Sequence, residues 1–430
     1  MSKLALFGGP KIVTTPFPTW PVYDDEDEKN LLDVLHTTNW WLYAYNKTFS
    51  KDGIPGKDFS HGDQFEHDFA AAQCVKHCHL VTSGTCDLEI ALEACGIGPG
   101  DEVITTPYTF IASSTSILRQ CALPVYVDID SETYNIDPTK IEQALTPKTR
   151  AIMPVHFGGE IADMDAIMPI AKKHNLIVIE DAAQAHGAIL EGNRGAGGIG
   201  DIGIFSFQQS KCMTAGEGGA VTTQNDDLAE AVWSLRNCGR SKTGIWYEHH
   251  RIGHNNRLTE WQAVMLRGQL RRLKHQCETR HRNFKQFCSY ISTIPGLAPC
   301  KLHPNAVQHN LYVPMFRFTG QGWDGLHRNK IVEALTAEGV DVSTGYGWPN
   351  YANPVFKTMQ HEWADRAFAF GLDKFPDWDA CAQRCPVAER ACSDEAVWLS
   401  HEPFLGDDND IRLLADAFAK VYECRTELTR

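Results

Sequence analysis

The chain has 430 residues, of which 43% are hydrophobic and 22% charged, and its formal net charge is −14. This length predicts two domains, or one large domain with a smaller companion, and the composition excludes disordered, collagen-like and coiled-coil proteins. The acidic charge argues against nucleic acid and anionic membranes as partners, and no apolar run approaches the roughly 18 residues of a membrane span.

The N-terminal segment lacks the basic and then apolar pattern of a signal peptide. The 14 cysteines do not form the CxxC pairs of zinc ribbons, and the chain is too long for a small disulfide scaffold, so we expect a reduced, cytoplasmic protein. Cys74, His77, Cys78 and His79 have the residue types of a metal site, but they lie where a helix is expected to meet a strand. We interpret them as ordinary side chains and predict no metal.

Short β-branched runs alternate with amphipathic segments between about Phe65 and Thr223. Strands separated by helices of this length predict an α/β fold with a central sheet of seven mostly parallel strands, covered by helices on both faces. The expected strands are residues 79–82, 102–106, 124–127, 151–155, 176–179, 203–207 and 219–223. Ligands of such sheets bind at the carboxyl ends of the strands.

The pattern changes after about Arg257. A long helical stretch, LTEWQAVMLRGQLRRLKHQCETRHRNFKQF, is followed by the strand-like LYVPMFRF and by Pro-rich turns. This predicts a smaller C-terminal α+β domain that is tethered by a long helix. We expect the large domain at residues 1–256 and the small domain at residues 257–430.

Polar side chains follow two of the predicted strands. Ser83-Gly84-Thr85 stands between the first strand and a helix that begins near Asp87. This is the composition of an anion site at a helix N-terminus, and also that of an ordinary cap. Asp181, in EDAAQ, follows a buried strand. A carboxylate there needs a cation such as a protonated ring nitrogen, unless it caps a helix.

Lys211 lies between a further apolar strand and a glycine-rich loop, TAGEGG, which is a poor place for a solvated lysine. Lysines against apolar surroundings form Schiff bases, although a lysine that simply extends to solvent is the commoner case. An anion site, which we call the anion cup, a carboxylate and an amine that can form an imine are thus expected at one edge of the sheet. Together these three groups are what pyridoxal phosphate needs for binding.

The segment GAGGIG, at residues 195–200, matches the GxGxxG pattern formally. It precedes a strand, whereas the dinucleotide fingerprint follows a strand and opens a helix. We therefore predict a flexible loop here rather than a nucleotide site.

Eight motifs follow one another along the chain: TSGT, GIGPGDEVITTPYTF, PVYVDID, AIMPVHFGGEIADMDAI, VIEDAAQAHGA, GDIGIFSFQQSK, TAGEGGAVTT and GHNNRLTEWQA. As an ordered set they resemble the DegT/DnrJ/StrS-type aminotransferases, fold-type I pyridoxal-phosphate enzymes that aminate keto-sugars and carbocyclic ketones. The similarity extends over nearly the whole chain. The segments FQQSKCMTAGEGG and NWW are most similar to the cyclitol (scyllo-inosose) aminotransferases and the 3-amino-5-hydroxybenzoate synthases.

The resemblance implies how the cofactor, pyridoxal 5′-phosphate, would be held. Lys211 would bind it as an imine and later carry the proton between cofactor and substrate. Asp181 would pair with the pyridinium nitrogen. Gln184 would lie near the phenolic oxygen, and Phe110 would stack on the opposite face of the ring.

The resemblance also assigns the phosphate contacts. Gly84, Thr85 and Ser206 would hold the phosphate, and Asn255 would reach it from a second subunit, which implies a homodimer with shared active sites. Arg257, in the same NxR motif, would lie near the phosphate or a substrate carboxylate.

Four aromatic residues, Trp40, Trp41, Tyr346 and Trp348, are candidates to line the substrate pocket, with ordinary packing as the alternative. Residues 44–66 form a longer stretch than we expect for the family, at the position of its substrate-side loop. The sequence therefore leaves the acceptor open.

We expect an aminotransferase that moves an amino group from glutamine or glutamate to a cyclic ketone, either a keto-cyclitol or a keto-sugar, by a ping-pong mechanism. One alternative is a dehydrating, aromatising synthase of the aminohydroxybenzoate type, whose product is lighter by the water that it loses. The other is a non-catalytic sensor, against which the lysine, the carboxylate and the phosphate cup all argue.

Overall fold

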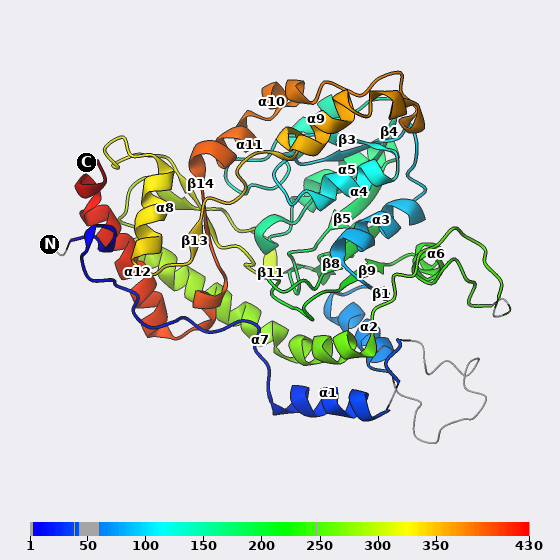
Figure 1. Cartoon of the computed structure of the whole chain (residues 1–430), viewed down its shortest axis with the longest axis horizontal. Helices are drawn as coiled ribbons and strands as arrows, with labels where there is room; N and C mark the ends of the chain where they lie inside the picture. Colours follow the sequence, from blue (N-terminus) through cyan, green and yellow to red (C-terminus); the bar gives the residue numbers. More distant parts are fainter. Residues whose placement is uncertain (1–2, 38, 43–59, 244, 246, 430) are drawn as a thin grey trace.

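The computed structural model of the chain describes residues 3–37, 39–42, 60–243, 245 and 247–429. The large domain is built on a seven-stranded sheet, and a smaller domain with a four-stranded sheet lies beside it, with a long helix running between them (Figure 1). The two ends of the chain lie close together at the far end of the smaller domain.

The seven predicted strands all belong to the large sheet, and their ends differ from the prediction by at most three residues. Strand β9 runs antiparallel to β1 and β8, and the other neighbours are parallel, so the predicted mostly parallel sheet is confirmed. In spatial order the strands are β1 (His77–Val81), β9 (Gly219–Thr223), β8 (Ile202–Ser206), β5 (Ile177–Asp181), β4 (Thr149–Ile152), β2 (Glu102–Thr105) and β3 (Leu123–Tyr126).

Helices cover both faces of this sheet. One face packs against α2 (His61–Ala72) and α5 (Met164–His174), and the other against α3 (Gly84–Ala94), α4 (Ala112–Arg119) and α6 (Asp226–Arg236).

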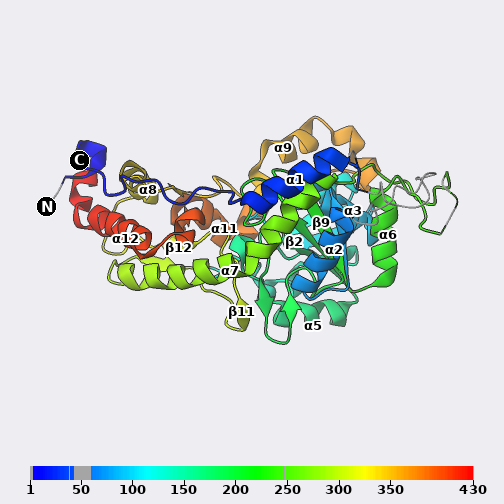
Figure 2. The same cartoon turned by 90° about the horizontal axis from the view of Figure 1, so that it is seen from below.

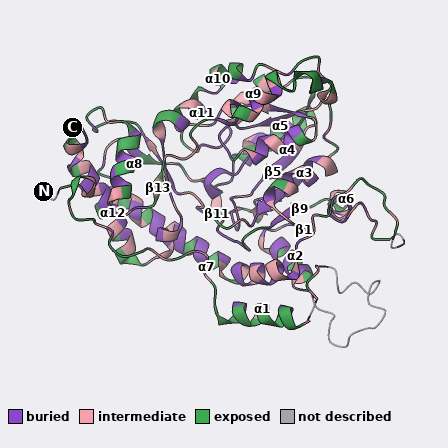
Figure 3. Cartoon of the chain, viewed as in Figure 1, coloured by how far each residue is buried: buried purple, intermediate pink, exposed green. Residues whose placement is uncertain are grey.

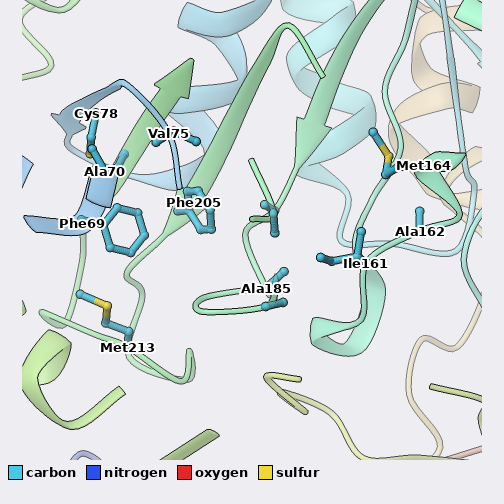
Figure 4. Close-up of a cluster of buried hydrophobic side chains, with 14 of the residues drawn as sticks. Phe69, Ala70, Val75, Cys78, Ile161, Ala162, Met164, Ala185, Phe205 and Met213 are labelled. Carbon is cyan, nitrogen blue, oxygen red and sulfur yellow. The ribbon is translucent and has the colours of Figure 1, made fainter. Parts of the chain in front are cut away.

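Because successive strand residues face opposite sides, a strand that is covered twice must be apolar at nearly every position. In β8, Phe205 joins the cluster under α2 while Ile204 joins the cluster under α3. Figure 4 shows Phe205 beside Phe69 of α2, and their ring centroids are 4.9 Å apart.

The predicted long helix is α7 (Glu260–Ile291), which runs from beneath the large sheet into the small domain (Figure 1). Its first half contributes Leu266 and Leu273 to the core of the large domain, and its second half contributes Phe284 and Phe287 to the core of the small domain. Helix α1 (Asp25–Thr37) lies along α7 and is mostly exposed (Figures 2 and 3).

The small domain has an antiparallel sheet. Its strands, in spatial order, are β10 (Leu297–Pro299), β12 (Met315–Phe318), β14 (Ala396–Leu399) and β13 (Val342–Ser343). Helices α8 (Arg328–Ala337) and α12 (Asp408–Glu423) pack on this sheet and on each other. A third, three-stranded sheet consists of β11 (Ala306–Gln308), β6 (Ile189–Leu190) and β7 (Arg194–Gly195).

Two segments pack across the boundary that the sequence predicts between residues 256 and 257. Near the N-terminus, Leu4 and Val13 belong to the core of the small domain. In the other direction, residues 351–392 cover the β3 edge of the large sheet, where the rings of Tyr351 and Tyr126 are 5.4 Å apart. This covering segment contains α9 (Pro354–His361), α10 (Cys381–Arg384) and α11 (Pro386–Arg390), at the top of Figure 1. The boundary itself stays a prediction.

No helix in the described part of the chain is long and apolar enough to cross a membrane. The described residues also contain no group of three or more His, Cys, Asp or Glu side chains placed to hold a metal ion.

Candidate functional site

A cavity of about 530 Å³ lies at the carboxyl ends of β1, β5 and β8. The converging strand ends supply its floor, as the sequence predicts. Tyr312, Val313 and Trp398 complete the wall from the small-domain side. Eight of the predicted site residues line this cavity: Gly84, Thr85, Phe110, Asp181, Gln184, Ser206, Lys211 and Tyr346.

The turn between β1 and α3 forms the predicted anion cup. Ser83 caps α3 by accepting a hydrogen bond from the Cys86 N–H (3.3 Å). A Cβ on Gly84 would lie 2.7 Å from the Cβ of Ser206, so the turn approaches the end of β8 this closely only because residue 84 is glycine. The unpaired N–H groups of a helix N-terminus and the hydroxyls of Thr85 and Ser206 thus border one space, which suits a phosphate.

Asp181 is buried at the end of β5 and faces the cavity. Its Oδ2 accepts a hydrogen bond from Ser113 Oγ (2.7 Å), and its Oδ1 accepts one from the Ala183 N–H (3.2 Å). Burial raises the pKa of this carboxyl above its ordinary value, although these hydrogen bonds oppose the shift. A cation placed against Asp181 would lower the pKa of this carboxyl and favour its ionised form.

Glu180, the preceding residue, points to the opposite face of the sheet and is fully buried. His156 Nε2–H donates to its Oε2 (2.8 Å), as does the Gly197 N–H (2.9 Å). The N–H groups of Ile199 (2.7 Å) and Gly200 (2.6 Å) donate to its Oε1. The GxGxxG-like segment therefore encloses a carboxylate of the protein itself. The predicted loop is present after β7, and its backbone is held by hydrogen bonds to this carboxylate.

Gln184 is held in one orientation. Its Oε1 accepts a hydrogen bond from the Gly158 N–H (2.8 Å), and its backbone carbonyl accepts one from Asn310 Nδ2 (2.6 Å). Because the side-chain oxygen is engaged in this way, the amide NH₂ faces the hydroxyl of Tyr346, and its second N–H can donate to a ligand. This orientation suits a negatively charged phenolic oxygen.

Lys211 is half-buried in the loop after β8. Its Nζ lies 4.3 Å from the centroid of the Tyr312 ring, at the distance of a cation–π contact. The Tyr312 hydroxyl in turn lies 2.9 Å from Ser210 Oγ. Ser210, the residue before Lys211, is therefore linked to the Tyr312 ring that lies against the Lys211 amine. This link limits the positions that Nζ can take.

Tyr346 and Trp398 form an aromatic wall of the cavity, with ring centroids 4.8 Å apart in an edge-to-face arrangement. Trp398 Nε1–H donates to the hydroxyl of Tyr108 (3.1 Å). Burial raises the pKa of Tyr346, so its hydroxyl stays neutral. A side chain at Gly345 would collide with the Trp398 ring, which explains the glycine before Tyr346.

Five predicted residues do not line the cavity in this single chain. Trp40 packs on Trp261, with ring centroids 5.2 Å apart. Arg257 donates to Asn237 Oδ1 (2.8 Å) and lies over the Trp41 ring (5.3 Å). The remaining two, Asn255 and Trp348, are exposed. In the stretch 44–66, residues 44–59 lie outside the described residues.

Sequence reasoning missed Tyr312, Trp398 and Ser113 as parts of this site. Tyr312 lies within the predicted strand-like run LYVPMFRF and Trp398 lies in β14, so neither follows a strand of the large sheet. Ser113 lies in α4, which follows β2, but it is not at the end of that strand. The signal that found the other residues, a polar side chain directly after a strand, is therefore missing here.

Residues 53–369 match the DegT/DnrJ/EryC1/StrS aminotransferase family. The chain belongs to this family. It is 38% identical over 424 residues to a putative L-glutamine:3-amino-2,3-dideoxy-scyllo-inosose aminotransferase of Streptoalloteichus tenebrarius, and the match covers 98% of both chains. It is 35% identical over 439 residues, 99% of both chains, to an L-glutamine:2-deoxy-scyllo-inosose aminotransferase of the same organism.

Among solved structures, the crystal structure of 3-amino-5-hydroxybenzoic acid synthase matches with a TM-score of 0.81 at 34% identity, covering 94% of this chain and 98% of that chain. The resemblance seen in the motifs and the predicted fold class are therefore confirmed. The protein is an aminotransferase with the fold-type I architecture of this family.

A substitution at Glu180 tests whether its hydrogen bonds hold the glycine loop at residues 195–200 in place. Glu180→Gln keeps the size of the side chain, but its NH₂ would face N–H donors that now bond to a carboxylate oxygen. We expect a loss of about 3–5 kcal/mol in the free energy of unfolding, as for a broken buried charge network. Circular dichroism melts measure it, and Glu191→Gln, at an exposed position nearby, is the control. An unchanged melt would show that the loop is not held by this anion.

Proposed function

We propose that this aminotransferase binds pyridoxal 5′-phosphate and transfers an amino group from glutamine or glutamate to a cyclic ketone. The observation that carries the proposal is that Lys211, the buried carboxylate of Asp181 and the N-terminus of α3 border one cavity. Glutamine as donor and an inosose-type ketone as acceptor are supported by the names of the two relatives above.

The residues of the cavity fit this cofactor at three points. The cup at Gly84, Thr85 and Ser206 suits a phosphate, and Asp181 lacks only a cation opposite its carboxylate. Lys211 is the one amine in the cavity lining, as far as the described residues show. Phe110, which is 58% exposed, lies at the rim, where an aromatic ring can cover a bound ligand.

When bound, pyridoxal phosphate supplies an electron-accepting ring that stabilises negative charge on the carbon that loses its proton. Asp181 keeps the ring nitrogen protonated, and the two hydrogen bonds from Ser113 and Ala183 orient its carboxylate. Gln184 donates to the phenolic oxygen, and the N-terminus of α3 binds the phosphate.

Lys211 would hold the cofactor through Nζ, and this amine would be free once an amino-acid donor is bound. Its free Nζ then takes the proton from the α-carbon of the donor, and in the second half-reaction it returns a proton to the former carbonyl carbon of the acceptor. Tyr312 and Ser210 are positioning residues, because they hold the amine within reach of both carbons. Tyr346 and Trp398 shield the cavity from water on the small-domain side.

The half-reaction with glutamine tests this assignment. Purified protein loaded with pyridoxal phosphate should lose its imine absorbance when glutamine is added. Borohydride reduction followed by peptide mapping should place the pyridoxyl group on Lys211. Lys211→Ala should lose the conversion by on the order of 10⁴-fold or more, since both attachment and proton transfer disappear. Labelling of another lysine would overturn the assignment.

Asp181→Asn should keep the fold and impair the chemistry. An amide cannot hold the ring nitrogen protonated, so the half-reaction with glutamine should slow by roughly 10²-fold or more. Stopped-flow absorbance measures the rate, and a melting curve of the same protein controls for folding. If the variant reacts at the wild-type rate, Asp181 serves only as a structural residue.

Two alternatives are distinguished by the same experiments. A synthase of the aminohydroxybenzoate type is supported less than amination, because the chain is 38% identical to a relative named an aminotransferase and 34% identical to the synthase. Mass analysis of the product detects a loss of water. A sensor without catalysis would show no half-reaction with any amino acid.

We further propose that the active unit is a homodimer with shared sites. Asn255 lies outside the cavity of its own chain and is exposed. The loop before it carries Ile245, Tyr247 and Ile252, which are 78%, 74% and 90% exposed, and it extends away from the body of the chain beyond α6 (Figure 1). Apolar side chains exposed to this degree on one loop support an interface.

Mixing Lys211→Ala with Asn255→Ala subunits tests the shared site. In a heterodimer both defects fall in one site and leave the other intact, so activity should rise to about half of the wild-type value per dimer. Each homodimeric parent is the control, and native mass spectrometry confirms subunit exchange. No recovery would mean that Asn255 acts within its own chain.

A reduced, cytoplasmic setting also stays a proposal. It is supported by the 14 cysteines, all of which are free thiols in the structure.

A further inference from the structure

An arginine is buried at the junction of the two domains without a carboxylate partner. Arg280 lies in α7, between Leu273, which packs in the core of the large domain, and Phe284, which packs in the core of the small domain. Its side chain is fully buried and forms no ion pair with any described residue. A buried charge without a counter-ion is unfavourable, so packing alone does not explain this arginine.

The hydrogen bonds of Arg280 converge on one residue, Asn310. The Nε–H group donates to the backbone carbonyl of Asn310 (2.8 Å), and Nη2–H donates to its side-chain Oδ1 (2.9 Å). Nη2 also lies 3.5 Å from Cys277 Sγ, one helical turn earlier. Two donors of one planar guanidinium thus fix both the backbone and the side chain of Asn310, which the single ammonium of a lysine cannot do.

Asn310 in turn is bonded to Gln184. Because Oδ1 accepts from Arg280, the orientation of the Asn310 amide is set, and Nδ2 donates to the backbone carbonyl of Gln184 (2.6 Å). Gly158 holds the other end of Gln184, since its N–H donates to Oε1 (2.8 Å) and its own carbonyl accepts from the Val313 N–H (3.1 Å). The residue proposed to donate to the phenolic oxygen is therefore fixed at its backbone and at its side chain.

The segment that begins with Asn310 also brings Tyr312 to Lys211. Leu311 has a φ of 55°, a left-handed conformation that leucine rarely adopts, so the backbone turns just before Tyr312. A Cβ on Gly159 would lie 2.8 Å from the backbone nitrogen of Tyr312 and 3.1 Å from that of Leu311, so the segment packs closely on its neighbour. Fixing Asn310 therefore also fixes the Tyr312 ring, 4.3 Å from Lys211 Nζ.

We propose that Arg280 is a positioning residue that acts through Asn310 to fix Gln184 at the phenolic oxygen of the cofactor and Tyr312 at the amine of Lys211. This inference rests on the proposed function and adds to it a pair of residues that act from a distance. Neither Arg280 nor Asn310 is among the described residues that line the cavity.

The proposal has a consequence that can be seen in the absorbance of the cofactor. A hydrogen bond from Gln184 stabilises negative charge on the phenolic oxygen, so this oxygen attracts the proton of the neighbouring imine less strongly. If the Gln184 amide is displaced, the imine should keep its proton to a higher pH. A loss of fold stability alone does not change the pH of this transition.

The test follows the imine absorbance against pH in the enzyme loaded with pyridoxal phosphate. Asn310→Ala leaves the charge of Arg280 in place and should raise the pH of the transition by about one unit. Arg280→Lys keeps the charge but loses the fork, and should raise it by a similar amount. The double variant should shift no further than either single variant, since both changes break the same link.

Calorimetric titration of pyridoxamine phosphate, which forms no bond to Lys211, gives a second measurement that does not depend on turnover. Each variant should bind it on the order of tenfold more weakly than the wild-type protein does. Arg282→Lys, at an exposed position of the same helix, is the matched control and should behave as the wild type in both experiments. Melting curves identify a variant that does not fold, and Asn310→Ala serves alone if Arg280→Lys is such a variant.

Folded variants that titrate at the wild-type pH would overturn the proposal. So would additive shifts in the double variant, or a wild-type transition in Arg280→Lys, because the charge rather than the fork would then act on the site. A wild-type protein that forms no imine with pyridoxal phosphate would overturn the proposed function instead. The calorimetric comparison would then still decide whether Arg280 and Asn310 shape the binding site.

Discussion

The end of β5 places two consecutive carboxylates on opposite faces of the large sheet, and the protein satisfies them very differently. Glu180 accepts four hydrogen bonds from His156 and the glycine loop. The carboxylate of Asp181 accepts two hydrogen bonds, one from the Ser113 hydroxyl and one from the Ala183 N–H, and burial raises its pKa. The carboxylate of Glu180 therefore has all its partners within the protein and plays a structural role. The carboxylate of Asp181 has no cation bonded to it among the described residues, and this is what makes it suited to the cationic ring of the proposed cofactor.

The other parts of the site depend on this arrangement. The His156 N–H donates to the carbonyl of Asp181 (3.0 Å), so the histidine that binds Glu180 also fixes the backbone beside the cavity. A side chain at Gly197 would collide with Phe205 in β8, the strand that leads to Ser206 and Lys211. The packing of the glycine loop on one face of the sheet therefore sets the position of the reacting groups on the other.

The sequence alone was sufficient to predict the strands of the large sheet and the residues that directly follow them. All seven strands were predictable because burial on both faces makes each strand a near-continuous apolar run, and Lys211 and Asp181 were predictable because they follow such runs. Tyr312 and Trp398 were not, because they are brought to the cavity by the small domain, through packing along α7 that no local pattern reveals. The contact between the glycine loop and Glu180 was not predictable either, because the two segments are apart in the sequence.

The charges around the cavity also bear on how the amino-acid donor is bound. Among the described lining residues Lys211 is the one cation, and in the proposed function the cofactor would engage it. Glutamine and glutamate carry an α-carboxylate that needs a positive partner. The partner must therefore come from outside the lining of this chain's cavity. Arg257, which is held beside Asn237 and Trp41, follows Asn255 by two residues, in the segment that we propose reaches the site of a second subunit. In that dimer the guanidinium of Arg257 would be the partner for the α-carboxylate of the amino-acid donor.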